Sequence, residues 1–166
     1  MSYFKRILSD IRTLEPIYPI CGGIALTVLG FITLMSCRCH PIYDWILLPR
    51  AALPYWIFAL LGILMFFMMG TCIGLLFAVS RCRNRVYTAV LLLAASVILT
   101  MIWYHVLFSV FNTFLSLLIL LSAIATELLF IGKTIYYNTL ASVSIVPVLI
   151  IQIHFIWLNI GIRFLN

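Results

Sequence analysis

Four long stretches without a charged residue decide what this chain can fold into. They run from Ile17 to Cys37, from Ala51 to Ser80, from Val86 to Thr126 and from Thr134 to Ile162. A helix that crosses the apolar core of a bilayer needs about 20 apolar residues, so the first, second and fourth stretches each supply one span. The third is roughly twice too long for one crossing and must turn back. The polar residues His105, Ser109 and Asn112 mark the expected turn.

The sequence therefore predicts an all-α, polytopic membrane protein, a bundle of five transmembrane helices in a single domain, 1–166. The helices are expected near 17–37, 54–79, 86–105, 112–132 and 140–163. Helices are required because lipid offers no hydrogen bonds to free backbone groups. Hydrophobic residues make up 66% of the chain and charged residues 8%, too few charges to cover a surface in water.

The basic residues predict how the bundle is oriented in the membrane. Seven of the ten lysines and arginines fall on the side of the amino terminus, namely Lys5, Arg6, Arg12, Arg81, Arg83, Arg85 and Lys133. The positive-inside rule then puts the amino terminus in the cytoplasm, in the cell membrane if the protein is bacterial. Residues 1–16 are expected to form a short amphipathic segment on the membrane surface. Contact with anionic lipid explains the net charge of +6, so no nucleic-acid partner is expected.

A stripe of small residues on the second helix predicts close helix packing. Gly62, Phe66, Gly70 and Gly74 share one helical face, and Gly70 and Gly74 form a GxxxG pattern. Small residues let helix backbones approach each other in lipid. The favoured partner is another helix of the same chain, and a homodimer through the same face is the alternative.

The cysteines do not form a convincing metal site. Cys37, Cys39 and His40 are clustered, but zinc sites normally need four ligands and no second cluster supplies the fourth. No metal and no cofactor is therefore expected. The remaining cysteines are interpreted as small apolar packing residues, namely Cys21, Cys72 and Cys82.

Glu127 is the one acidic residue at membrane depth. A carboxylate in lipid is costly and by default suggests a function, but Glu127 could also reach water at the inner end or be neutral. His154, with Gln152 nearby, is expected to bond a neighbouring helix. No catalytic triad, carboxylate pair or phosphate-binding glycine loop is found, so the residues predict no catalytic site.

Aromatic residues gather at the expected outer ends of the second and third helices. They are Tyr43, Trp45, Tyr55, Trp56, Phe58, Trp103 and Tyr104. One interpretation is an interfacial aromatic belt, which needs no ligand. The other is an aromatic-lined cavity for a flat apolar molecule.

Two sequence blocks resemble one known family. The first contains Tyr43, Pro49, the run Pro54-Tyr-Trp-Ile-Phe58 and then Met69-Gly70. The second contains Ala141, Pro147, Leu158-Asn159 and the closing Leu165-Asn166, with a weaker match at Ser96, Thr100 and Trp103. Together they resemble the TspO/MBR family, the tryptophan-rich sensory proteins also called translocator proteins or peripheral benzodiazepine receptors.

The resemblance implies a five-helix receptor or carrier for a hydrophobic ligand. Family members bind tetrapyrroles, sterols and benzodiazepine-type molecules in an aromatic-lined cavity, so a porphyrin, haem or a sterol-like lipid would be a ligand of this chain. The lining residues that the resemblance implies are Trp56, Phe58, Phe66, Thr100, Trp103, Ile151, His154 and Phe155. Pro49 and Pro54 would shape residues 38–53 as a lid over the cavity.

The departures from the family pattern define the alternatives. Ile151 stands where the family has tryptophan, which argues against the light-assisted porphyrin degradation attributed to some members. Phe155 stands where the family has alanine, and its ring is expected to narrow the cavity. The alternatives are a structural or interaction protein that keeps the fold without the pocket, and a porphyrin-degrading enzyme.

Overall fold

The computed structural model describes residues 15–37, 43–50, 52–79 and 83–166, and this part of the chain is helical with no strand. Its main helices are α2 (Ile17–Ser36), α4 (Tyr55–Val79), α5 (Arg83–Phe108), α6 (Thr113–Thr134), α7 (Thr139–Ser144) and α8 (Val146–Leu165). Five segments are long and apolar enough to cross a membrane, with α7 and α8 together forming the fifth. The predicted all-α bundle of five transmembrane helices is confirmed.

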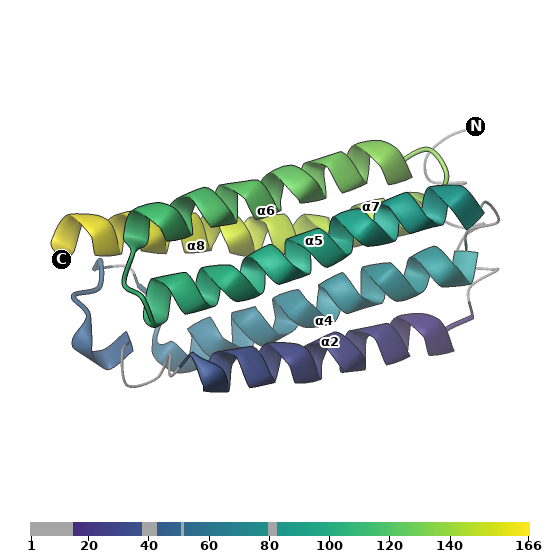
Figure 1. The fold of residues 1–166 in the computed structure, drawn as a ribbon. Coiled ribbons are helices and arrows are strands. Elements are labelled where there is room, and N and C mark those ends of the chain that lie inside the picture. Colours follow the sequence, from purple (N-terminus) through teal and green to yellow (C-terminus); the bar gives the residue numbers. More distant parts are fainter. Residues whose placement is uncertain (1–14, 38–42, 51, 80–82) are drawn as a thin grey trace.

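The helices lie side by side along one common direction (Figure 1). α2 packs mainly on α4, α5 on α6, and α6 on α8. One end of the bundle carries residues 43–50 and 52–54, the turn between α5 and α6, and the carboxyl-terminal end of α8 (Figure 1). We call this end the loop end.

The glycine stripe of α4 packs against α2 of the same chain. A Cβ atom on Gly70 would lie 2.1 Å from the Gly22 carbonyl oxygen, and one on Gly74 would lie 2.2 Å from the Tyr18 carbonyl oxygen. Only glycine lets the two backbones come this close. The prediction of an intramolecular contact is confirmed, and we call it the glycine seam.

The long third stretch turns back where its polar residues predicted. α5 ends at Phe108, and Phe111 adopts a left-handed backbone with φ 57°. The Asn112 side chain then caps α6 by accepting a hydrogen bond of 3.0 Å from the Leu115 backbone N–H. Asparagine is favoured at this position because its side-chain oxygen satisfies an amide that has no partner within the helix.

The fifth span differs from the prediction, which took 140–163 as one continuous helix. α7 ends at Ser144 and α8 begins at Val146, with a break at Ile145. Pro147 has no backbone N–H to donate back along the helix, and its ring clashes with the preceding turn. The proline therefore separates a short helix from the rest of the span.

Candidate functional site

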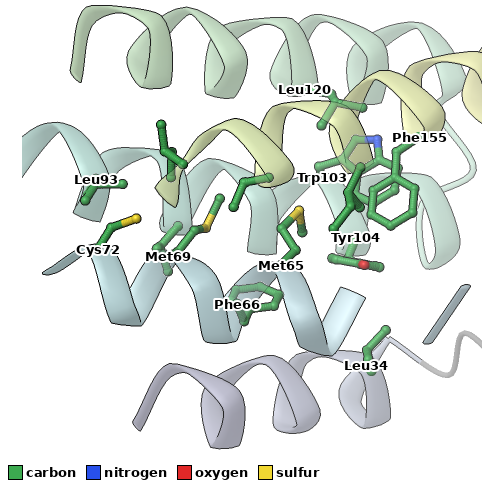
Figure 2. Close-up of a cluster of buried hydrophobic side chains, with 14 of the residues drawn as sticks. Leu34, Met65, Phe66, Met69, Cys72, Leu93, Trp103, Tyr104, Leu120 and Phe155 are labelled. Atoms are coloured by element: carbon green, nitrogen blue, oxygen red, sulfur yellow. The ribbon is translucent and has the colours of Figure 1, made fainter. Parts of the chain in front are cut away.

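A cluster of buried aromatic rings occupies the loop end of the bundle, with Phe155 of α8 at its centre. Its ring stacks on Trp103 of α5, with centroids 5.1 Å apart and planes 12° apart. The Phe58 ring of α4 lies 5.1 Å from Phe155 on another side. Figure 2 shows the rings of Phe155, Trp103 and Tyr104 grouped between α8 and α5. Rings from two helices, α4 and α5, thus converge on one residue of α8.

Residues 43–50 and 52–54 cover this cluster from the loop end, and we call them the covering segment. The Tyr43 ring contacts Phe58 at 5.2 Å and Phe108 at 6.5 Å. Its hydroxyl donates a hydrogen bond of 2.5 Å to the Leu53 carbonyl. Only 3% of Tyr43 is exposed, and this burial raises the pKa of its phenol above the usual 10.0. Tyr43 thereby joins the segment to the helices beneath it.

The same segment is also fastened to the end of α8. The Asn166 side chain accepts a hydrogen bond from the Leu47 N–H at 3.2 Å and donates one to the Leu47 carbonyl at 3.0 Å. Pro49 lies against Gly161, where a Cβ atom would come within 2.7 Å of the proline ring. These contacts hold the segment across the end of the bundle.

Among the described residues, two hollows open at the loop end. One, of about 600 Å³, is lined by the covering segment between Tyr43 and Tyr55, including Pro49 and Pro54. The other, of about 420 Å³, lies between Trp45, Phe111 and Arg163. The first adjoins the aromatic cluster because Tyr43 belongs to both.

The structure brings together four of the eight residues predicted to line a cavity. Phe58, Trp103 and Phe155 contact one another through Phe155, and Phe66 joins them through the Tyr104 ring at 6.4 Å. The four are almost completely buried. That they bind a ligand stays a prediction.

The other four predicted residues lie around or outside this cluster. Thr100 and Ile151 are buried, and His154 is partly exposed and stacks on Trp157 at 5.7 Å. Trp56 is 66% exposed on the outer side of α4, away from the buried rings. Each of the two interpretations of the aromatic residues therefore fits part of the group. Trp45 and Trp56 face outward, as in an interfacial belt, whereas Tyr43 and Phe58 face inward.

Besides Tyr43, two residues of the cluster were missing from the predicted lining set. The Tyr104 ring contacts those of Phe58, Trp103 and Phe155, and Phe108 contacts Phe58 at 5.5 Å. Tyr104 and Phe108 are four residues apart and share one face of α5. That spacing was the signal in the sequence that could have identified them.

A polar layer lies deeper in the bundle, between α5, α6 and α8. Glu127 Oε1 accepts hydrogen bonds of 2.6 Å from both Ser96 Oγ and Gln152 Nε2. Glu127 is fully buried, so the expectation that it could reach water at the inner end is wrong in this structure. Glu127 Oε2, Gln152 Oε1 and Thr100 Oγ1 have no hydrogen-bond partner among the described residues.

A second polar layer connects the same three helices nearer the loop end. With the Asn159 amide oriented to suit its partners, Oδ1 accepts from Trp103 Nε1 at 3.2 Å and lies 2.7 Å from Ser116 Oγ. Its Nδ2 donates to the Thr113 carbonyl at 3.0 Å. The indole of Trp103 is therefore stacked on one side and hydrogen-bonded at its edge.

The cysteines divide between the core and the surface. Cys72 is buried and donates to the Ala141 carbonyl at 3.7 Å, as a packing residue should. Cys21 is exposed on α2, so the prediction that it packs is wrong. Cys39, His40 and Cys82 lie outside the described residues, which contain no group of three potential metal ligands.

No protein-family model matches the chain, and no curated protein is significantly similar to it. The resemblance to the TspO/MBR family therefore rests on the two motif blocks alone.

Proposed function

We propose that this membrane protein is a receptor or carrier for a small hydrophobic ligand, of the kind bound by TspO/MBR proteins. The proposal rests mainly on the aromatic cluster at the loop end, where buried rings from α4, α5 and α8 meet beneath a covering segment. Rigid aromatic walls bind flat apolar molecules through large contact areas. The 600 Å³ hollow in the covering segment is within the usual size range of small-molecule sites.

The size of the ligand would be limited by Phe155. Its ring stacks on Trp103 and fills the space between α5 and α8. A porphyrin would have to displace this ring, whereas a narrower molecule such as a sterol-like lipid would enter between the covering segment and the cluster. Replacing Phe155 with alanine should therefore raise the affinity for porphyrin roughly tenfold, which equals about 1.4 kcal/mol.

A ligand titration tests the proposal. Purified wild type and Phe155→Ala are titrated with protoporphyrin, haem and a sterol, with quenching of tryptophan fluorescence and thermal stabilisation as readouts. Phe77→Ala is the matched control because this phenylalanine of α4 is 53% exposed. Binding of none of the three molecules by either folded protein would contradict the proposal.

Two tryptophan variants then locate the binding site. Trp103→Ala removes a wall of the cluster, and Trp56→Ala removes an outward-facing ring. Loss of a stacked wall should weaken binding by about 1–3 kcal/mol. A loss confined to Trp103→Ala supports the cluster, and a loss confined to Trp56→Ala assigns binding to the outer surface.

A second candidate is a structural or interaction protein with the same fold and no ligand. It is favoured by one observation, the close ring contacts around Phe155, with three centroid distances between 5.1 and 6.2 Å. A core filled in this way supports the bundle without any ligand. The same titration separates the candidates, because this one predicts no binding by wild type and no gain in Phe155→Ala.

The orientation in the membrane belongs to the proposal as well. The excess of basic residues on one side favours a cytoplasmic amino terminus. Cysteine labelling in intact cells tests this at Cys82, which should react only after the membrane is permeabilised. Reaction with an impermeant reagent from outside would reverse the assignment.

A further inference from the structure

Glu127 combines three features that a purely structural side chain rarely has. It lies seven residues from the end of α6 at Thr134, about 10 Å inside the span. It is fully buried, and its hydrogen-bond partners Ser96 and Gln152 are both uncharged. Its second carboxyl oxygen, Oε2, has no partner among the described residues.

Among the residues that the structure describes, no basic group faces this carboxyl group from the helices packed around it. Within one turn of Ser96, residues 92–100 of α5 contain no titratable side chain, and neither does α7. On α4 the titratable neighbour is the thiol of Cys72, which carries no positive charge.

The nearest basic groups whose side chains are described, on α8 and α6, point elsewhere. His154 is two residues from Gln152, hence about 200° away around α8, and it stacks on Trp157. Lys133 of α6 is exposed and lies about 9 Å along the helix from Glu127. Within the described part of the chain, an ionised Glu127 would therefore have no opposite charge beside it in a medium of low dielectric constant.

We propose that Glu127 is a proton-binding site inside the membrane, formed by the meeting of α5, α6 and α8. The proton resides on Oε2, because Oε1 already accepts two hydrogen bonds, from Ser96 Oγ and Gln152 Nε2. The bound proton makes the buried carboxyl group neutral while the bundle is closed. Release of the proton requires water at the carboxyl group, and so requires the three helices to separate locally.

A proton fits this site better than a metal ion does. Ser96 Oγ and Gln152 Nε2 both donate hydrogen bonds to Oε1. Their hydrogens carry partial positive charge, which would repel a metal ion on that side of the carboxyl group. The oxygens left without a partner are Glu127 Oε2, Gln152 Oε1 and Thr100 Oγ1, fewer than the six that hard cations commonly take. The proposal does not depend on the ligand-binding function, since it concerns a different part of the bundle.

Infrared spectroscopy tests the proposal on a fully folded protein. The chain contains two glutamates, Glu15 and Glu127, and Glu15 is exposed. In Glu15→Gln protein grown with carbon-13-labelled glutamate, the labelled side-chain carboxyl signal therefore belongs to Glu127. We expect the isotope-shifted band of a protonated carboxylic acid at neutral pH. A labelled carboxylate band in its place would overturn the proposal.

Two further arms make the result specific. Glu127→Gln in unlabelled protein should lose one protonated-acid band at neutral pH, and Glu127→Asp should retain such a band at a shifted frequency. The labelled spectrum should be identical in sodium and potassium buffers. A band that changes from acid to carboxylate when sodium is added would overturn the proton assignment in favour of a sodium site.

Discussion

The glycine seam and the α5–α6–α8 interface hold helices together in opposite ways. In the seam, α2 and α4 approach until their backbones touch at Gly22 and Gly70. In the interface, the helices are joined through side chains: two polar layers, at Glu127 and Asn159, and the stacked rings of Trp103 and Phe155. The seam is close because glycine has no side chain, whereas the interface depends on hydrogen bonds and ring contacts between side chains.

The difference shows which interactions can hold helices together in lipid, where the hydrophobic effect between helices is weak. Apolar surface gains little from packing on a neighbour when lipid is equally apolar, so close contact and hydrogen bonds between helices decide which helices pair. The seam tolerates no added atom because its partner is backbone. The interface should tolerate small substitutions, because side chains can change rotamer and amide groups can form hydrogen bonds with other partners. The two contacts should therefore respond differently to substitution.

The largest effect is expected for a bulky residue in the glycine seam. Gly70→Leu places its Cβ against the backbone of Gly22 and Gly23, which cannot move without displacing α2. We expect a loss of more than about 5 kcal/mol in the free energy of unfolding, at the extreme of single substitutions. Unfolding by SDS in mixed micelles, followed by circular dichroism, measures it.

Gly132→Leu is the matched control for this prediction. An added Cβ on Gly132 of α6 meets nothing within 4 Å, so its effect should stay within about 0.5 kcal/mol. Equal effects of the two leucines would mean that the seam is not a close contact in the membrane.

A smaller but still large effect is expected for Phe155→Ala in the interface. The side chain is fully buried between Trp103 and Phe58, and truncating a buried phenylalanine costs about 3–5 kcal/mol. Phe155→Ala should still fold, and its loss should be smaller than that of Gly70→Leu. Phe164→Ala, at an 83% exposed position of the same helix, should change the unfolding free energy little. A similar loss in both variants would show that Phe155 is not part of the packed core.

A pair of substitutions measures the contribution of one hydrogen bond to the interface. A double-mutant cycle of Ser116→Ala and Asn159→Ala measures the coupling of the two side chains, which lie 2.7 Å apart. Hydrogen bonds between transmembrane helices are worth about 0.6 kcal/mol on average and up to about 1.7 kcal/mol. We expect a coupling in this range. The parallel cycle of Ser122→Ala and Asn159→Ala should give none, because Ser122 is exposed and bonds within its own helix.

The seam could be predicted from the sequence and the interface only in part. Gly70 and Gly74 lie on one helix, and their spacing alone reveals a flat face. Glu127 was recognised as unusual at membrane depth, but its partners Ser96 and Gln152 are 31 and 25 residues away. Which distant polar residues meet depends on how three helices rotate and slide, which no local pattern specifies.

Trp56 and Pro147 show where local reasoning could have gone further. Trp56 and Phe58 are two residues apart, hence about 200° apart around α4, so both could not face one cluster. Phe58 is buried and Trp56 is exposed, as this geometry requires. Pro147 lies inside the predicted helix 140–163, and its missing N–H accounts for the break at Ile145. The family resemblance identified Trp56 and Pro147 by residue type alone. Helix geometry determines that Trp56 faces outward and that the helix breaks before Pro147.

An effect of similarly small size is expected at Tyr43, which contacts one helix of each region, α4 of the seam and α5 of the interface. Its ring contacts Phe58 of α4 and Phe108 of α5, and its hydroxyl bonds the Leu53 carbonyl. Tyr43→Phe keeps the ring and removes this hydrogen bond, at a cost of about 1 kcal/mol. Tyr136→Phe, at a 75% exposed position, is the control and should change the unfolding free energy little.

The cost of Tyr43→Phe should also depend on pH. Burial raises the pKa of the Tyr43 phenol above 10.0, so the folded protein holds this proton more firmly than the unfolded chain does. The stabilisation is complete below pH 10 and disappears as the pH rises through the raised pKa. Wild type should therefore lose its advantage over Tyr43→Phe in alkaline solution, while other titrating groups cancel in the comparison. An advantage that stays constant from neutral to strongly alkaline pH would mean that the hydroxyl is open to water, and that the covering segment does not seal the aromatic cluster.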